Sequence, residues 1–322
     1  MAFEIDIGFT SLAGNKDSNE DFCAALMPQK GEEGRGSIVA IADGVSTGGM
    51  GREAAQTTVT SLVRDYFGTP ETWDTTVALD RIIGAQNAWL AGVNRRRHPA
   101  MGLTTLTALV MRGQSYTLAH VGDSRAYRVR GGKVELLTQD HAVNHPDFRH
   151  QLLRAVGLED HVVVDYSQGE LLVGDVFVLL TDGVHGSVRA DVLDKRLVAL
   201  ACAVPLGSAQ AWSQQLVEGA LADGSDDNVT AMVVRVQGLM ESTLDDVKRL
   251  ALSLPIPPRM RIGEVLDGLV VTALVADNGI NVLYKVAPVA QLGSSGRHYV
   301  LKTLNPARAH DEEERGMLAH EA

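Results

Sequence analysis

The chain has 322 residues, of which 45% are hydrophobic, and a formal net charge of −11 at pH 7. This length suits one large domain with a small second piece, or two modest domains, and the apolar fraction is enough for a sizeable core. The acidic balance disfavours a nucleic-acid backbone or an anionic membrane as the main partner. It suits a site that gathers carboxylates around divalent cations.

Cysteine usage and the absence of targeting patterns indicate a cytoplasmic protein. Cys23 and Cys202 are far apart and form no Cys-x-x-Cys pair, so neither a zinc site nor a redox pair is predicted. Two isolated thiols fit a reducing compartment. Residues 1–15 show no secretory signal, and no apolar run reaches the ~18 residues that a membrane-spanning helix needs.

The pattern of strands and helices predicts an α+β fold. Because the predicted strands cluster and the helices come in pairs, the chain lacks the regular strand–helix alternation of a doubly wound sheet. We therefore expect antiparallel sheets with helices packed outside them. Helices are predicted at Gly51–Phe67, Val77–Arg97, Gln151–Val156 and over most of Ala190–Ala222. Strands are predicted at Phe3–Leu12, Phe22–Met27, Ser37–Ala42, Thr104–Met111, Tyr116–His120, Arg125–Val129, Lys133–Leu137, Val162–Tyr166, Val176–Leu180 and Val229–Val236.

The composition changes after Gly238. Residues 239–260 contain a polar helical stretch and then three prolines within the four residues Pro255 to Pro258, a pattern typical of a stiff, extended linker. Strand-like runs begin again at Arg261. The expected organisation is a domain over residues 1–238, a Pro-containing linker over 239–260 and a further piece over 261–322.

Five short acidic motifs stand at or near the ends of predicted strands. A buried strand that ends in Asp-Gly places a carboxylate at the rim of its sheet, because the glycine lets the backbone turn sharply. Mg²⁺ and Mn²⁺ prefer oxygen ligands. Carboxylates from Asp43, Asp182 and Asp227 could hold two such cations, which would polarise a water and stabilise an in-line phosphoryl displacement. The motifs are Lys16 to Asp21, Ala42 to Gly44, His120 to Arg125, Leu179 to Gly183 and Gly224 to Asn228.

Each motif alone has a simpler explanation. Asp-Gly is first of all a turn signal. Asp226 to Asn228 fits a turn cap, Glu20 and Asp21 fit a solvated surface, and Asp123 could form a local ion pair with Arg125. The metal hypothesis depends on all five motifs occurring together.

As an ordered set, the motifs resemble the metal-dependent protein serine/threonine phosphatases of the 2C type, in their bacterial form. The resemblance covers about residues 1–238 and is highly specific. It implies a four-layer α-β-β-α sandwich of two antiparallel sheets flanked by helices, in agreement with the strand pattern. It also implies hydrolysis of phosphoserine and phosphothreonine in proteins at a dinuclear Mg²⁺ or Mn²⁺ site. The matching residues are Asn19-Glu20-Asp21, Asp43-Gly44, Gly102-Leu103-Thr104-Thr105, Val121-Gly122-Asp123-Ser124-Arg125, Asp182-Gly183 and Asp227-Asn228.

The resemblance implies a ligand set. Asp43 would bridge the two cations, and Gly44 would bind one of them through its carbonyl. Asp182 and Asp227 would complete the other. Asp123, together with Asp182, would form a weaker third cation site.

The resemblance also implies roles around those ligands. Glu20 and Asp21 would act in or near the ligand shell, partly through metal-bound waters, and Asn228 would orient Asp227. Where the family usually has a phosphate-binding arginine, this chain has Lys16. We assign Lys16 the same role, although a lysine is a point charge without the bidentate fork of a guanidinium.

Residues 261–322 resemble the opening of a protein kinase domain. Tyr299 to Lys302 is similar to the strand with the ATP-contacting lysine, and Glu321 falls where that lysine's helix partner is expected. The phosphate-covering loop departs from G-x-G-x-x-G, since Gly279 is the one glycine of residues 276–283. The sequence has no His-Arg-Asp or Asp-Phe-Gly motif. The resemblance therefore implies a truncated kinase N-lobe, as in bacterial phosphatase–kinase fusions, without kinase activity of its own.

Two functions remain open at this point. The first is a phosphatase that acts on phosphoserine and phosphothreonine proteins, with a cognate Ser/Thr kinase as a further partner. The alternative is a catalytically weak regulatory or binding module with a phosphatase fold, partnered with a kinase. The intact set Asp43, Asp182 and Asp227 favours the enzyme. Neither a nucleic acid nor a membrane is expected as a partner.

Overall fold

The computed structural model describes residues 3–47, 50–97, 101–143, 151–202, 207–291 and 298–321. The chain divides into two compact units, Met1–Glu241 and Ser242–Ala322. Within the described ranges, no helix combines the length and the apolar character that crossing a bilayer requires. Cys23 and Cys202 are both free thiols.

Two five-stranded antiparallel sheets form the centre of the first unit, in the orders β1-β12-β11-β8-β9 and β10-β7-β6-β3-β2. The first sheet contains β1 (Glu4–Leu12), β12 (Val229–Gly238), β11 (Val176–Leu180), β8 (Arg125–Arg130) and β9 (Lys133–Leu136). The second contains β10 (Asp165–Glu170), β7 (Ser115–Val121), β6 (Leu106–Arg112), β3 (Ser37–Ala42) and β2 (Phe22–Leu26). A separate ribbon pairs β4 (Gly44–Thr47) with β5 (Met101–Thr104), and a short 3-10 turn, η1 (Glu33–Arg35), precedes β3.

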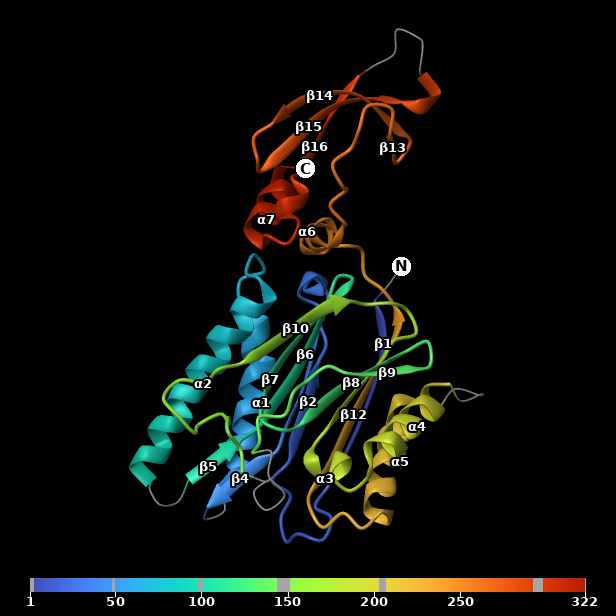
Figure 1. Ribbon diagram of the computed structural model, residues 1–322. Coiled ribbons are helices and arrows are strands. Elements are labelled where there is room, and N and C mark those ends of the chain that lie inside the picture. The colour runs from blue at the N-terminus through green and yellow to red at the C-terminus, as the bar shows by residue number, and fades with distance from the viewer. Residues whose placement is uncertain are drawn as a thin grey trace. The chain divides into compact units, whose positions relative to one another are not determined.

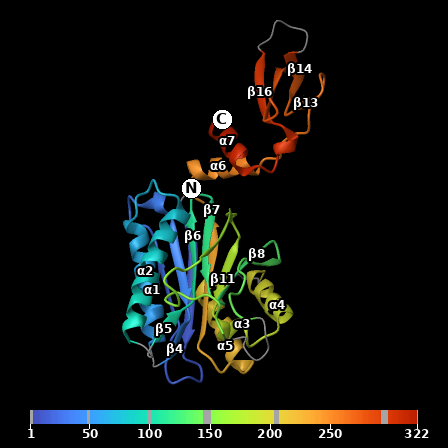
Figure 2. The ribbon, with the colours of Figure 1, turned by 60° about the vertical axis from the view of Figure 1, so that its left-hand side comes forward.

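Helices cover the outer faces of both sheets. The helices α1 (Gly51–Gly68) and α2 (Thr75–Arg97) pack on the second sheet, while α4 (Ala190–Ala201) and α5 (Ala209–Ala222) pack on the first. Figures 1 and 2 show the two helical layers on opposite sides of the paired sheets. The one-turn helix α3 (Asp182–His185) directly follows β11. This is the four-layer sandwich that the sequence predicts.

Two of the acidic motifs come at the ends of strands that are buried on both faces. All six residues of β3 are buried. Ile38 and Ala40 pack into the core under α1 and α2, whereas Val39 and Ile41 pack between the sheets. Such double burial explains the continuous apolar run in the sequence. The β11 strand is equally buried, and both strands end immediately before an acidic motif.

Two predicted elements differ from the structure. Residues 151–156 form no helix, because Val156 exchanges two backbone hydrogen bonds with Thr104 of β5. Short apolar runs do not distinguish helix from extended chain by periodicity alone. The strand predicted at Val162–Tyr166 is β10, which begins only at Asp165 and runs to Glu170 because its pairing with β7 sets its limits.

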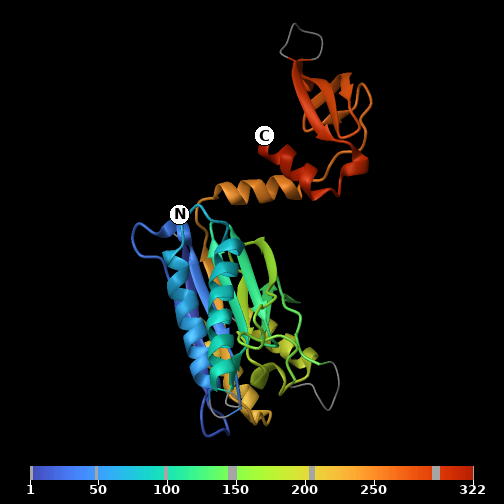
Figure 3. The same ribbon diagram turned by 90° about the vertical axis from the view of Figure 1, so that its left-hand side faces the viewer.

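The second unit contains a four-stranded antiparallel sheet in the order β13-β14-β15-β16 (Figure 3). Its small core is formed by Val271, Val282, Tyr284 and Val286. Within the segment predicted to be a linker, the structure forms a helix, α6, that begins with a capping box at Thr243. The elements are α6 (Leu244–Ser253), β13 (Val265–Leu266), β14 (Leu269–Asp277), β15 (Asn281–Pro288), η2 (Val289–Gln291), β16 (Tyr299–Leu304), η3 (Pro306–Arg308) and α7 (Glu312–Glu321).

Candidate metal centre

An acidic cavity of about 580 Å³ lies in the first unit, where the ends of strands from both sheets meet. Carboxylates dominate its lining, and Lys16 is the cation among the described lining residues. All the site residues predicted from the sequence line this cavity except Asp21. The lining residues are Lys16, Asp17, Ser18, Glu20, Asp43, Gly44, Val45, Asp123, Leu152, Asp182, Asp226, Asp227 and Asn228.

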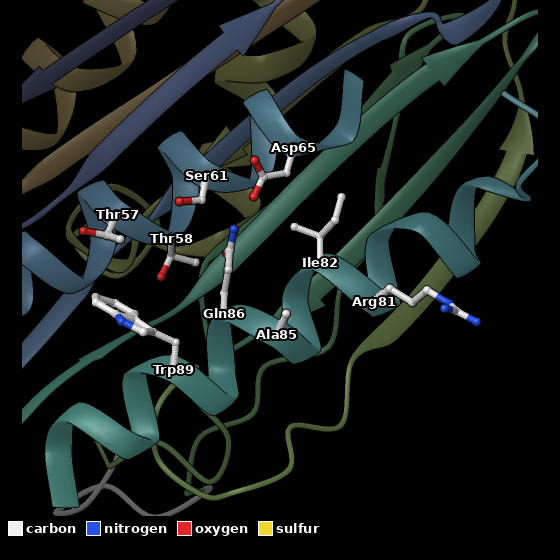
Figure 4. Close-up of a pocket in the computed structure, with 9 residues that line it drawn as sticks. All are labelled: Thr57, Thr58, Ser61, Asp65, Arg81, Ile82, Ala85, Gln86 and Trp89. Carbon is white, nitrogen blue, oxygen red and sulfur yellow. The ribbon is translucent and has the colours of Figure 1, made fainter. Parts of the chain in front are cut away.

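A second hollow, of about 480 Å³, lies between α1 and α2 (Figure 4). Asp65 and Ser61 on α1 lie opposite Gln86 and Trp89 on α2, while the Arg81 guanidinium extends away from the hollow, over the Trp73 ring. Asp65 is the one carboxylate among its described lining residues. This hollow therefore lacks the converging carboxylates that a pair of cations requires.

Asp43 is held by its backbone at the end of β3. Its N–H donates to Thr105 Oγ1 (2.9 Å), and its carbonyl accepts from the Thr105 N–H (2.9 Å). Burial raises the pKa of the Asp43 carboxyl well above its ordinary range, and the charges of Asp21 and Asp182 raise it further. The site thus disfavours a bare negative charge at Asp43, as expected where carboxyls crowd together without a cation.

Asp182 begins α3, and this short helix contacts two other acidic segments. Thr181, which precedes it, donates from Oγ1 to Asp21 Oδ2 (2.8 Å). The hydroxyl of Ser225 donates to the carbonyl of Gly183 (2.7 Å), which ties α3 to the turn before Asp227. The position of Asp182 is therefore set by segments that are far away in the sequence.

Asp21 and Glu20 lie in different surroundings. Asp21 is 5% exposed, its Oδ1 has no hydrogen-bond partner, and burial raises its pKa to about 7. The solvated surface considered for this motif is therefore wrong for Asp21. Glu20 lines the cavity, and its Oε2 occupies the space that a Cβ on Gly51 would need at the beginning of α1, where the helix dipole favours negative charge.

Asp123 lies at the end of a turn that only glycine readily adopts, since φ of Gly122 is +111°. The side chain is 8% exposed; burial, followed by the charge of Asp182, raises its pKa to about 7. Arg125 forms a bidentate ion pair with Asp140 (2.7 and 2.9 Å). The local pairing of Asp123 with Arg125 considered from the sequence is therefore wrong.

Lys16 and Asp227 form an ion pair on the rim of the cavity, with Nζ 3.2 Å from Oδ1 and both side chains about half exposed. The hydrogen bond with Asp227 raises the pKa of Lys16. The main-chain N–H of Asn228 donates to Asp227 Oδ1 (2.8 Å). The Asn228 side chain binds the loop before β2, donating to the Ser18 carbonyl (2.9 Å) and accepting from the Glu20 N–H (2.8 Å).

Sequence reasoning left three histidines outside the site. His120 is a buried residue whose ring nitrogens are both bonded, to Thr107 and to the Gln139 carbonyl. His141 Nδ1 accepts from the N–H of Gly122 (3.1 Å), and His185 Nε2 lies 2.9 Å from the carbonyl oxygen of Asp123. His141 and His185 each adjoin an acidic motif, but a single sequence carries no signal for these contacts.

The donor set fits hard divalent cations. Its side chains are oxygen donors, as Mg²⁺ and Mn²⁺ prefer, and a cation would favour the ionised forms of carboxyls such as Asp43 and Asp123, whose pKa values are raised. The buried, unpartnered Oδ1 of Asp21 adds a further unsatisfied acceptor beside the cavity. As they stand, the described residues present no group of three or more His, Cys, Asp or Glu side chains arranged to hold a metal ion.

Comparisons with known proteins agree on one family. The family profile described as Protein phosphatase 2C matches residues 10–222. The serine/threonine protein phosphatase PstP of Mycobacterium tuberculosis is 29% identical over 217 residues, which cover 62% of this chain and 40% of that protein. A putative protein phosphatase 2C-type of Streptococcus pyogenes is 27% identical over 244 residues, covering 70% of this chain and 94% of that protein. The chain thus spans less than half the length of the mycobacterial relative.

Solved structures of similar proteins match the first unit. The catalytic domain of PstP in complex with two manganese ions has a TM-score of 0.61 and 26% identity, over 73% of this chain and 99% of that one. PppA, described as a key regulatory component of the type VI secretion system in Pseudomonas aeruginosa, has a TM-score of 0.60 and 27% identity, over 72% of this chain and 97% of that one.

Proposed function

Because the chain belongs to the protein phosphatase 2C family, we propose that it hydrolyses phosphoserine and phosphothreonine in proteins with two bound Mn²⁺ or Mg²⁺ ions. The observation that carries this proposal is the single cavity lined by Asp43, which follows β3, Asp182, which follows β11, and Asp227, which precedes β12. The two manganese ions in the PstP structure support the choice of metal.

We assign the ligands as follows. Asp43, Asp182 and Asp227 would hold the two cations, with Asp43 shared between them, and the Gly44 carbonyl would contribute a further oxygen. Asp123, which lines the same cavity as Asp182 and feels its charge, would provide a weaker third position. When bound, the cations supply Lewis-acid activation of the attacking water and neutralise the charge of the phosphoryl group.

The remaining residues bind and orient. Lys16 is paired with Asp227 in this structure, and we propose that it turns to the substrate phosphate once Asp227 binds metal. Asn228 fastens the loop that carries Lys16. Glu20 lies on the cavity wall, and Asp21 lies beneath it, where its bond to Thr181 supports the start of α3. Both carboxylates can accept hydrogen bonds from water near the cations.

The test is Mn²⁺-dependent hydrolysis of a phosphothreonine peptide. We expect Asp43→Asn and Asp182→Asn to lower turnover by about 100-fold or more, since each removes a charged ligand, and EDTA to abolish it. Asp65→Asn is a matched control, because it removes a carboxylate from the hollow between α1 and α2. Full activity of Asp43→Asn would refute the assignment. Mn²⁺ binding by calorimetry without any turnover would support the alternative, a regulatory or binding module.

We further infer that residues 261–322 form the opening part of a kinase N-lobe, and we propose a cognate Ser/Thr kinase as a further partner. An antiparallel sheet followed by α7 supports this inference, as does the position of Lys302 on β16 and of Glu321 at the end of α7. We expect no transfer of labelled phosphate from ATP by this chain. Lys302→Met should leave phosphopeptide turnover unchanged, and a kinase reaction that this variant abolishes would contradict the expectation.

A further inference from the structure

The helix α3 carries a carboxylate at its first residue and an imidazole at its last. Asp182 and His185 are three residues apart, so they lie about one turn from each other on the same side of the helix. The His185 ring is 8% exposed, and its Nε2 is 2.9 Å from the main-chain oxygen of Asp123. A carbonyl oxygen only accepts, so Nε2 carries the proton and donates it.

The rest of α3 is fixed to its surroundings. The N–H of Gly186 donates to the carbonyl of Asp182 (2.7 Å) and closes the helical turn. Ser225 donates to the carbonyl of Gly183, and Thr181 donates to Asp21. Because these bonds hold the start of the helix and close its single turn, they limit how far the His185 ring can move relative to Asp182.

The Asp123 segment is held on both sides by other parts of the fold. Gly122, before it, donates to His141 Nδ1 (3.1 Å). Ser124, after it, shares a hydrogen bond with Thr105 (2.9 Å), the same hydroxyl that accepts from the N–H of Asp43. These contacts connect the Asp123 segment to His141 and to Thr105, which lies between β5 and β6 and also binds the Asp43 backbone. The bond from His185 connects the Asp123 backbone to α3.

We propose that His185 is a positioning residue that holds Asp123 opposite Asp182 and so sets the affinity of the third cation position. The proposal rests on the proposed function, since it requires the cavity to bind cations. The matching family motif ends at Gly183, so the resemblance assigns nothing to position 185. A partner of this kind acts on metal affinity by fixing the orientation of a ligand.

The experiment measures Mn²⁺ binding to the full chain by titration calorimetry. We expect His185→Ala to weaken the weakest class of Mn²⁺ sites by about 10-fold and to leave the tighter class within about twofold of the wild type. His185→Gln should restore the weak class, because its amide N–H can donate to the same carbonyl. Ser187→Ala is the matched control: it removes a hydrogen bond from just beyond α3 to the Val184 carbonyl of the helix (2.9 Å), without touching Asp123.

The outcomes separate the two proposals. Identical isotherms for the wild type and His185→Ala overturn the positioning role, and so does a folded His185→Gln that binds no better than His185→Ala. If His185→Ala fails to fold, His185→Met fills the same space without a donor; a chain that also fails to fold with Met shows a structural role and overturns the proposal. Absence of Mn²⁺ binding in the wild type, or wild-type binding in Asp182→Asn, would instead refute the proposed function.

Discussion

Gly183→Ala is expected to separate two of the proposed ligands without removing either. A Cβ at position 183 would lie 1.9 Å from the main-chain oxygen of Asn228, whereas ordinary contacts begin at 3.4 Å. The added Cβ and the carbonyl oxygen are both fixed directly to the backbone, so no side-chain rotation relieves the overlap. The two backbone segments must therefore part by about 1.5 Å. Asp182 directly precedes Gly183 and Asp227 directly precedes Asn228, so their carboxyls move apart with the backbone.

The magnitude follows from this displacement. A misplacement of about 1 Å costs on the order of 100-fold in rate, and forcing an extra carbon into a packed site costs about 1–3 kcal/mol of stability. We therefore expect Mn²⁺-dependent turnover of the phosphopeptide to fall by about 100-fold in Gly183→Ala. Mn²⁺ affinity should fall as well, and the urea midpoint should decrease.

The control for this variant is Gly84→Ala. Gly84 lies within α2, and an added Cβ would meet no atom within 4 Å. This substitution should raise stability by about 0.5–1 kcal/mol through helix propensity and leave turnover unchanged. Wild-type turnover and Mn²⁺ affinity in Gly183→Ala would show that the contact between Gly183 and Asn228 does not set the spacing of the ligands.

Two further predictions concern stability. Burial, together with the nearby His141 ring, lowers the pKa of His120 to about 4, against about 6.5 in the unfolded chain. The folded state therefore binds fewer protons than the unfolded state in this pH range. The contribution of neutral His120 to the free energy of unfolding is complete above pH 6.5 and is lost as the pH falls towards 4, by up to about 1.4 kcal/mol per pH unit. Urea unfolding between pH 7 and 4 should show a shallower decline in His120→Gln, and equal slopes would contradict this reasoning. Arg130 binds both carboxylate oxygens of the fully buried Asp175 at 2.6 Å. Arg130→Met should therefore lower the free energy of unfolding by about 3 kcal/mol, because it leaves that charge without its cation. A loss below about 1 kcal/mol, or no recovery of stability on adding Asp175→Asn, would argue against this explanation.

The sequence by itself determined the layers of the first unit and the strand ends at which the carboxylates stand. The runs Ser37–Ala42 and Val176–Leu180 are apolar at every position or nearly so, because each strand is buried between a second sheet and a helical layer. Local periodicity and local turn chemistry encode such strands and the Asp-Gly steps that follow them. For the same reason the two long helices were predicted within a few residues of their observed limits.

Tertiary structure alone decided which polar groups meet. Lys16 pairs with Asp227, Thr181 supports Asp21 from 160 residues away, and His185 reaches the carbonyl of Asp123. It also prevented a helix at residues 151–156, where Val156 exchanges backbone bonds with Thr104. These contacts join segments that are distant along the chain. Which groups meet depends on how the two sheets and the segments that connect their strands pack together. No periodicity within one segment records that packing, so its consequences for the site come from the folded molecule.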